Sequence, residues 1–168
     1  MTTDSRQLTL AGEGKSVWLG GLGVDFKIYG EQTGGALAIV EHPIEPGRLV
    51  PPHLHHDEDE YSYILEGRIG ARIGDEIIEA GPGAYVCKPR NVPHTFWNPG
   101  PDPARLIEII APAGFERFFA ELAELFGSVA PEEYPTRRAA LGRKYHQDFI
   151  DGWADDLKER FGLKLLGE

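Results

Sequence analysis

The chain has 168 residues, of which 41% are hydrophobic and 26% are charged. This length supports one well-cored domain, and the composition is typical of a folded protein rather than a disordered one. The formal net charge of −10 argues against the nucleic-acid backbone or an anionic membrane surface as partner, because both require a basic patch.

The N-terminal segment, residues 1–14, lacks the basic stretch and apolar run of a secretory signal. The longest apolar stretches, such as residues 36–40, are far shorter than the roughly 20 residues that a membrane span requires. The single cysteine, Cys87, excludes an intramolecular disulfide and is expected to be a small buried hydrophobe in a strand. These features predict a cytoplasmic protein with no membrane segment.

From residue 15 to residue 112 the chain consists of short β-prone runs interrupted by glycine and proline, such as VDFKIYG, EYSYILEG and ARLIEIIAP. Turn residues at about every 8 to 12 positions are typical of an antiparallel sandwich or barrel. Gly67 and Gly74 can supply the positive φ that tight hairpin turns need. The pattern therefore predicts an all-β domain over residues 15–112.

After Pro112 the hydrophobic period changes from two residues to about 3.6, which indicates helices. An amphipathic helix is expected from Phe115 to Gly127, and further helices at about 135–146 and 153–161, with Asp151 as a candidate N-cap of the last. Residues 113–168 should form a helical extension that packs on the sheet or across a homodimer, because short free helices are marginal in water.

The stretch PPHLHHDEDEY, residues 51–61, carries three of the six histidines and four consecutive acidic residues. His53 and His55 are one residue apart, so in an extended chain both imidazoles lie on the same face. A turn through residues 56–59 would bring Glu60 alongside them at the start of the next apolar run. Imidazole nitrogens and a carboxylate oxygen suit a divalent transition ion.

His94, in the stretch PRNVPHTFWN, is the fourth candidate ligand. Two prolines and Asn91 predict a turn just before it, and strand alternation then places His94, Phe96 and Asn98 on one face. If this strand lies beside the first stretch, the set becomes three histidines and one glutamate.

These two stretches resemble the two sequence motifs of the cupin superfamily. The first motif is glycine, five residues, HxH, three or four residues, glutamate, six residues and glycine, and its positions are Gly47, His53, His55, Glu60 and Gly67. The second motif is matched by Gly83, Pro89, His94 and Asn98, with Asn91 where the family usually has glycine. Asparagine tolerates the left-handed backbone conformation better than most residues, so the departure should leave the turn intact.

The resemblance implies a jelly-roll β-barrel that binds one divalent transition metal ion per chain. The implied ligands are His53, His55, Glu60 and His94. Fe, Ni, Mn, Co, Cu and Zn all accept such ligands, so the metal stays open.

Other histidines and acids near these motifs are expected to have plainer roles. His56 should face away from the site if the chain stays extended. Asp59 fits the shorter motif spacing, but Gly67 lies at the right distance from Glu60, and residues 57–59 are expected to form a solvated bend. His42 and His146 lie outside both motifs and should have surface or core roles.

A single barrel followed by APAGFERFFAEL and a helical tail also looks like small bacterial cupins grouped with quercetin 2,3-dioxygenases. That resemblance implies a dioxygenase that cleaves a flavonol-like aromatic enol with O₂ and releases carbon monoxide. Glu60 would be both metal ligand and general base, accepting the proton of the substrate hydroxyl. Ile64 and Phe96, expected to face inward, would make the substrate pocket partly apolar.

Two alternatives remain, because a fold does not select a reaction. One is a metal-dependent isomerase or lyase that acts on a small polar metabolite. The other is a non-catalytic protein that binds a small ligand. In each case the expected partners are a small molecule and a second copy of the chain, and no cofactor site beyond the metal is assigned.

Overall fold

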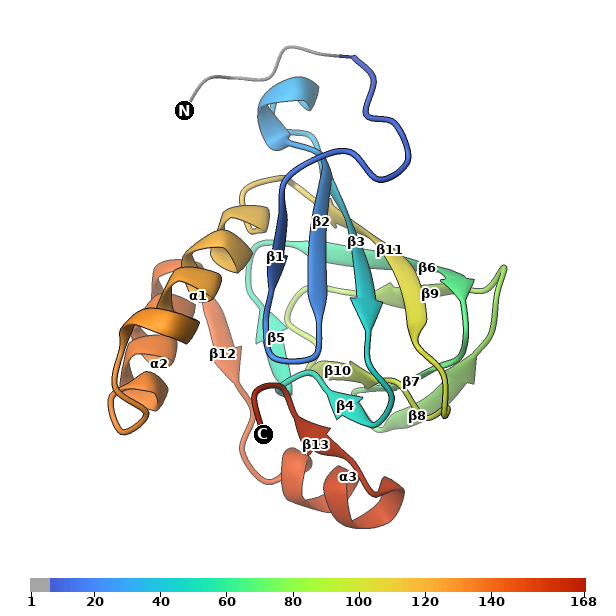
Figure 1. Ribbon diagram of the computed structural model, residues 1–168, viewed down its shortest axis with the longest axis vertical. Helices are drawn as coiled ribbons and strands as arrows, with labels where there is room; N and C mark the ends of the chain where they lie inside the picture. The colour runs from blue at the N-terminus through green and yellow to red at the C-terminus, as the bar shows by residue number, and fades with distance from the viewer. Residues whose placement is uncertain (1–6) are drawn as a thin grey trace.

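The computed structural model describes residues 7–168, so residues 1–6 of the expected N-terminal segment lie outside the described part. In that part the strands form two sheets, a short 3-10 helix (Gly30–Thr33) precedes the third strand, and the α-helices follow in the C-terminal third of the chain (Figure 1). The predicted β-rich domain with C-terminal helices is thus observed.

The first sheet contains six strands of the described chain, joined by antiparallel ladders. In spatial order they are β1 (Ser16–Trp18), β2 (Gly23–Ile28), β3 (Ala38–Ile44), β11 (Ala104–Ala111), β6 (Asp59–Glu66) and β9 (Tyr85–Lys88). Side chains along β11 alternate between buried and half-buried, because successive strand residues point to opposite faces of a sheet. One face of this sheet therefore forms the core.

The second sheet carries most of the histidine motif and part of the C-terminal tail. Its order is β12 (Gln147–Phe149), β5 (His53–His55), β10 (His94–Trp97), β4 (Arg48–Leu49) and β13 (Lys164–Leu165), with β7 (Ile69–Ile73) pairing both β10 and β8 (Glu76–Ala80). Its ladders are antiparallel except that between β13 and β4. The tail thus adds two strands to this sheet, which the helical periodicity did not predict.

The two sheets face each other across one apolar core. Ile64, Leu106 and Ile110 from the first sheet are fully buried in the same cluster as Ala71 and Phe96 from the second. The expected jelly-roll is therefore observed as two sheets packed face to face, with their inward side chains between them.

Backbone geometry at three turns agrees with the residue types found there. Gly67 and Gly74 have φ values of 72° and 57°, and Asn91 has a φ of 60°. Asn91 is the residue that replaces the usual glycine of the second motif, and it adopts the left-handed conformation as predicted.

The exposure of Cys87 in strand β9 differs from the expectation. Val86 and Lys88 are buried, whereas Tyr85 and Cys87 on the opposite face are exposed. Cys87 was expected to be buried, but the alternation of the strand turns it away from the core. The inward position is taken instead by the charged Lys88.

The tail contains α1 (Glu116–Ser128), α2 (Tyr134–Lys144) and α3 (Trp153–Phe161). In Figure 1, α1 and α2 lie together beside β12, and α3 lies next to β13. The N-cap of α3 is Gly152, with a φ of 82°, rather than the expected Asp151. Glycine adopts that conformation at little cost, whereas a residue with a Cβ is strained there.

The helices contact different parts of the β-structure. The apolar side of α1 enters the main core through Phe118, Phe119 and Leu122. Leu157 of α3 packs with Leu49 and Trp97 in a second buried cluster. Among residues 7–168, no helix is both long and apolar enough to span a membrane.

Candidate metal centre

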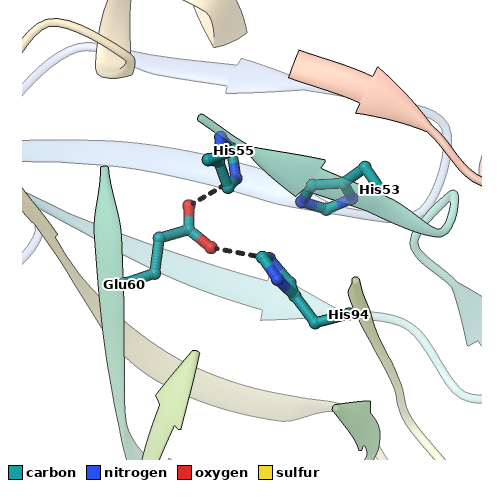
Figure 2. A group of neighbouring side chains, drawn as sticks. All are labelled: His53, His55, Glu60 and His94. Atoms are coloured by element: carbon teal, nitrogen blue, oxygen red, sulfur yellow. Dashed lines mark ion pairs between the residues drawn. The ribbon is translucent and has the colours of Figure 1, made fainter. Parts of the chain in front are cut away.

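Three neighbouring strands position the four predicted ligands. Strand β5 carries His53 and His55. Both are buried, whereas Leu54, which lies between them in the sequence, is half-buried. The pairing of β10 with β5 places His94 directly opposite His53. Glu60, near the start of β6 in the other sheet, reaches the group from the opposite side (Figure 2).

The four side chains offer ligand atoms that all lie within 4.8 Å of one another. The Glu60 carboxylate lies between two imidazoles, with Oε1 3.3 Å from His55 Nε2 and Oε2 3.2 Å from His94 Nε2 (Figure 2). The ring centres of His53 and His94 are 4.5 Å apart. The side chains therefore converge on one small volume.

Backbone carbonyls determine which imidazole nitrogens face that volume. His53 Nδ1 donates to the Pro51 carbonyl oxygen at 2.6 Å, and His94 Nδ1 donates to that of Val92 at 3.0 Å. Because a carbonyl oxygen only accepts, Nδ1 carries the proton in both rings, and Nε2 of the neutral ring keeps its lone pair. His94 Nε2 and His55 Nε2 are buried without a hydrogen-bond partner in the described chain, as expected of atoms that bind a metal.

Electrostatics at the site favours the protonation states of ligands. Burial, reinforced by the neighbouring imidazoles, holds the pKa of His53 well below its usual value, and burial also lowers the pKa of His94. Burial opposes the ionisation of Glu60, but Lys88 and His55 outweigh it, so the pKa of Glu60 also lies well below its usual value. Neutral histidines and an ionised carboxylate are the forms that bind metal.

The donor set therefore fits one divalent transition metal ion, which His53, His55, Glu60 and His94 would hold. Imidazole and carboxylate donors do not single out one metal. The structure brings together all four residues that the sequence motifs indicated.

The remaining histidines have separate partners. His56 is exposed and lies 2.7 Å from Asp148 Oδ2, while His146 Nδ1 lies 2.6 Å from Asp57 Oδ2. His42 is buried in the core, where its Nδ1 donates to the Gly23 carbonyl oxygen at 2.8 Å.

The acidic bend at residues 57–59 differs from the expected solvated loop at one position. Asp59 pairs with the Arg90 guanidinium, but Glu58 is only 8% exposed. Glu58 Oε2 lies 3.6 Å from His55 Nδ1, and burial raises the pKa of Glu58 to about 7. Neither of these two atoms has a hydrogen-bond partner in the described chain, so Glu58 is a buried neighbour of the candidate ligand His55 and does not orient its ring through a hydrogen bond.

Two buried charges that the sequence reasoning missed adjoin the ligands. Lys88 Nζ lies 2.7 Å from Glu108 Oε2 and 3.4 Å from Glu60 Oε2, and all three side chains are nearly inaccessible. Ser62 Oγ donates to Glu108 Oε2 at 2.9 Å. Burial raises the pKa of Glu108 to about 7 despite Lys88. Burial disfavours the charge of Lys88, but Glu108 and Glu60 outweigh it and raise its pKa.

The sequence contained a weak indication that Lys88 and Glu108 are buried. In β11 Glu108 lies between Leu106 and Ile110 on one face, and in β9 Lys88 shares a face with Val86. Both faces of β11 are rich in apolar residues, so the sequence alone does not show which face is buried. A charged residue in an otherwise apolar strand was the available hint.

A cavity of about 60 Å³ opens beside the ligands. Of the predicted pocket residues, Phe96 lines it, together with His53, Glu60 and Glu108. Ile64, the other predicted pocket residue, is fully buried in the apolar core and is not part of the lining. Most of the remaining wall is aromatic or aliphatic, and α1 with the residue before it contributes five of these side chains: Phe115, Phe118, Phe119, Leu122 and Phe126.

Comparison with known proteins finds one matching family model and several similar proteins. Residues 41–110 match the family model described as the Cupin domain. A curated relative, the tetracenomycin polyketide synthase protein TcmJ of Streptomyces glaucescens, is 32% identical over 108 residues, which are 64% of this chain and 66% of TcmJ. The match therefore spans just under two thirds of the relative's length.

Solved structures resemble the chain at lower identity. An RmlC-like cupin from Shewanella frigidimarina is 20% identical with a TM-score of 0.57, over 64% of this chain and 92% of the other. Streptomyces PAC13, solved with uridine, is 16% identical with a TM-score of 0.55, over 67% and 86% of the two chains. At these identities the likeness concerns the fold.

Proposed function

The chain belongs to the cupin superfamily, and from this premise we propose that it is a metal-dependent dioxygenase that cleaves a flavonol-like aromatic enol with O₂. The observation that carries the proposal is that two of the four clustered candidate ligands, His53 and Glu60, line a cavity whose wall is largely aromatic. A divalent ion bound there would supply Lewis acidity and open coordination positions.

The chain's own residues would handle the proton and exclude water. Glu60 would accept the proton of the substrate hydroxyl, and Lys88, 3.4 Å away, keeps that carboxylate ionised. Phe96 and Phe115 line the cavity and would contact the rings of the substrate while keeping solvent out. An apolar wall of this kind favours an aromatic substrate over a sugar phosphate, which would call for several cationic side chains.

The curated relative is consistent with an enol substrate. Its name assigns TcmJ to a polyketide synthase, and polyketide chains carry carbonyl groups that enolise. An enolisable oxygen is the group that the proposed reaction requires.

The test combines elemental analysis of the purified protein with an oxygen electrode and a series of flavonols. The wild type should hold about one transition metal ion per chain and consume oxygen as the flavonol absorbance falls. Glu60→Gln removes the base, so turnover should fall by about 10²- to 10⁴-fold while part of the metal is retained.

Glu66→Gln is the matched control, because Glu66 lies on the same strand with an exposed side chain. It should retain both metal and turnover. Unchanged flavonol-dependent oxygen uptake in Glu60→Gln would rule out the base role. A purified protein with neither bound metal nor a metal-induced thermal shift would overturn the metal-dependent function.

A second candidate is a metal-dependent isomerase or lyase, and Glu108 favours it. Glu108 Oε1 has no hydrogen-bond partner in the described chain, the residue lines the cavity, and its pKa is raised to about 7. Such a carboxyl group can both take and return a proton near neutral pH. Turnover that continues unchanged without oxygen would favour this candidate over the dioxygenase.

A further inference from the structure

The C-terminal tail supplies part of the wall next to the metal ligands. Strand β12 pairs with β5 so that Gln147 lies opposite His55 and Phe149 opposite His53. Directly opposite residues of an antiparallel pair project to the same face of the sheet. Gln147 and Phe149 therefore stand on the ligand side of the sheet, and both line the cavity.

Two polar groups on this wall lack the partners that buried groups usually have. Gln147 is 4% exposed, and its Oε1 has no hydrogen-bond partner among residues 7–168. Arg138 of α2 also lines the cavity, and its buried Nε likewise has no partner in that part of the chain. Buried polar atoms are nearly always paired, so two orphans at one cavity indicate groups that a ligand satisfies.

Arg138 is a cation with no carboxylate partner in the described chain, in a protein whose net charge is −10. Its guanidinium carbon lies 4.5 Å from the centre of the Phe149 ring, so it stands against the wall that β12 forms. Burial disfavours its charge and lowers the pKa of Arg138. An anionic ligand would offset that cost, because guanidinium binds oxyanions through paired, charge-assisted hydrogen bonds.

Between these groups and the ligand cluster the cavity is apolar, with Phe115, Phe119 and Leu122 of the α1 region in its lining. The cavity volume of about 60 Å³ is smaller than the roughly 150 Å³ in which a benzene ring is held. A ring, including those of the flavonol proposed above, therefore requires this cavity to widen.

We propose that the cavity binds a planar aromatic molecule that carries an anionic oxygen group, with Arg138 pairing with the anion and Gln147 with a hydroxyl group. The proposal rests on the function proposed above, because it names the substrate class of the same cavity. Carboxylates and phenolates share the required chemistry. Arg138 and Gln147 are then residues that determine specificity, and both come from the tail rather than from the two cupin motifs.

The test compares two probes of equal size, 4-hydroxybenzoate and 4-hydroxybenzamide, by calorimetric titration of the full-length protein. The wild type should bind the carboxylate at least about tenfold more tightly than the amide, the effect of one charge-assisted pair. Arg138→Met, which keeps the length of the side chain but removes the charge, should lose this preference by weakening the carboxylate alone. Arg137→Met is the control, because Arg137 is the preceding residue and is exposed, and this variant should retain the preference for the carboxylate.

Three results would overturn the proposal: equal affinities in the wild type, a preference that survives in Arg138→Met, or no binding of either probe. If Arg138→Met does not fold, Arg138→Gln replaces it. Titrations of metal-free protein separate the two proposals. A carboxylate preference in a chain that fails to bind metal would support the cavity assignment and refute the metal-dependent function.

Discussion

Lys88 is the residue on which the charge balance of the site depends. It is the cation between two buried carboxylates, Glu60 and Glu108. A buried ion pair is not by itself a large source of stability, but removing one partner leaves an uncompensated buried charge. Lys88 thus stabilises the charge of the candidate ligand Glu60 without being a candidate ligand itself.

Lys88→Met is expected to lower the free energy of unfolding by about 3–5 kcal/mol, since both carboxylates lose their cation. Urea denaturation of metal-free protein at pH 8 measures this, where both acids are ionised in the wild type. Lys144→Met is the control, because Lys144 pairs with Glu121 at an exposed site, and such a pair contributes about 0–1 kcal/mol. Equal losses in the two variants would contradict the assigned role of Lys88.

At the scale of elements, the strands of the tail matter as much as its helices. Strand β12 extends the ligand-bearing sheet beside β5, and β13 joins its other end beside β4. Helix α3 lies between them in the chain and covers Leu49 and Trp97 with Leu157. The tail therefore pairs with the second sheet at two places, through β12 and through β13.

Leu157→Ala tests this docking of α3. Leu157 is fully buried, so its truncation should cost about 2–5 kcal/mol of unfolding free energy through lost contacts and a cavity. Leu10→Ala, at a site that is 55% exposed, should change stability by less than about 0.5 kcal/mol. Thermal and urea denaturation compare the two, and a loss at Leu157 as small as that at Leu10 would argue against a packed tail.

At the scale of the whole molecule, the buried His42 links stability to pH. Burial lowers its pKa to about 4, below the value of about 6.5 in the unfolded chain. A group whose pKa is depressed on folding stabilises the protein above its unfolded pKa, and that contribution is lost as the pH falls through the folded pKa. The folded state should therefore weaken between pH 6.5 and pH 4.

Between these pH values His42 should account for a loss of about 3 kcal/mol, from about 1.4 kcal/mol per pKa unit. His42→Asn keeps a donor for the Gly23 carbonyl oxygen but cannot become cationic. In chelator-treated protein, the variant should lose correspondingly less stability over this range, as measured by urea denaturation at several pH values. Identical pH profiles for variant and wild type would show that His42 does not titrate as described.

Several features were predictable because they depend on local spacing. His53 and His55 are two residues apart in number, so any extended strand places both imidazoles on one face. Asn91 and the turn glycines are residue types that favour a positive φ, and they have one. The amphipathic period predicted α1 and α3 closely. The three-residue strand β12 is too short to show any period, so its pairing with β5 could not be read from the chain. The homodimer and the cytoplasmic location stay predictions.

The sequence by itself determined the β-rich fold, the C-terminal helices and the four candidate ligands, because side-chain periodicity and motif spacing are local properties of the chain. Only the tertiary structure decided that Lys88 and Glu108 adjoin Glu60, that Glu58 is buried, and that Arg138 and Gln147 reach the same cavity. These relations depend on which strands pair and which faces meet. Burial and charge compensation arise from contacts between residues far apart in the sequence, and local patterns do not encode those contacts.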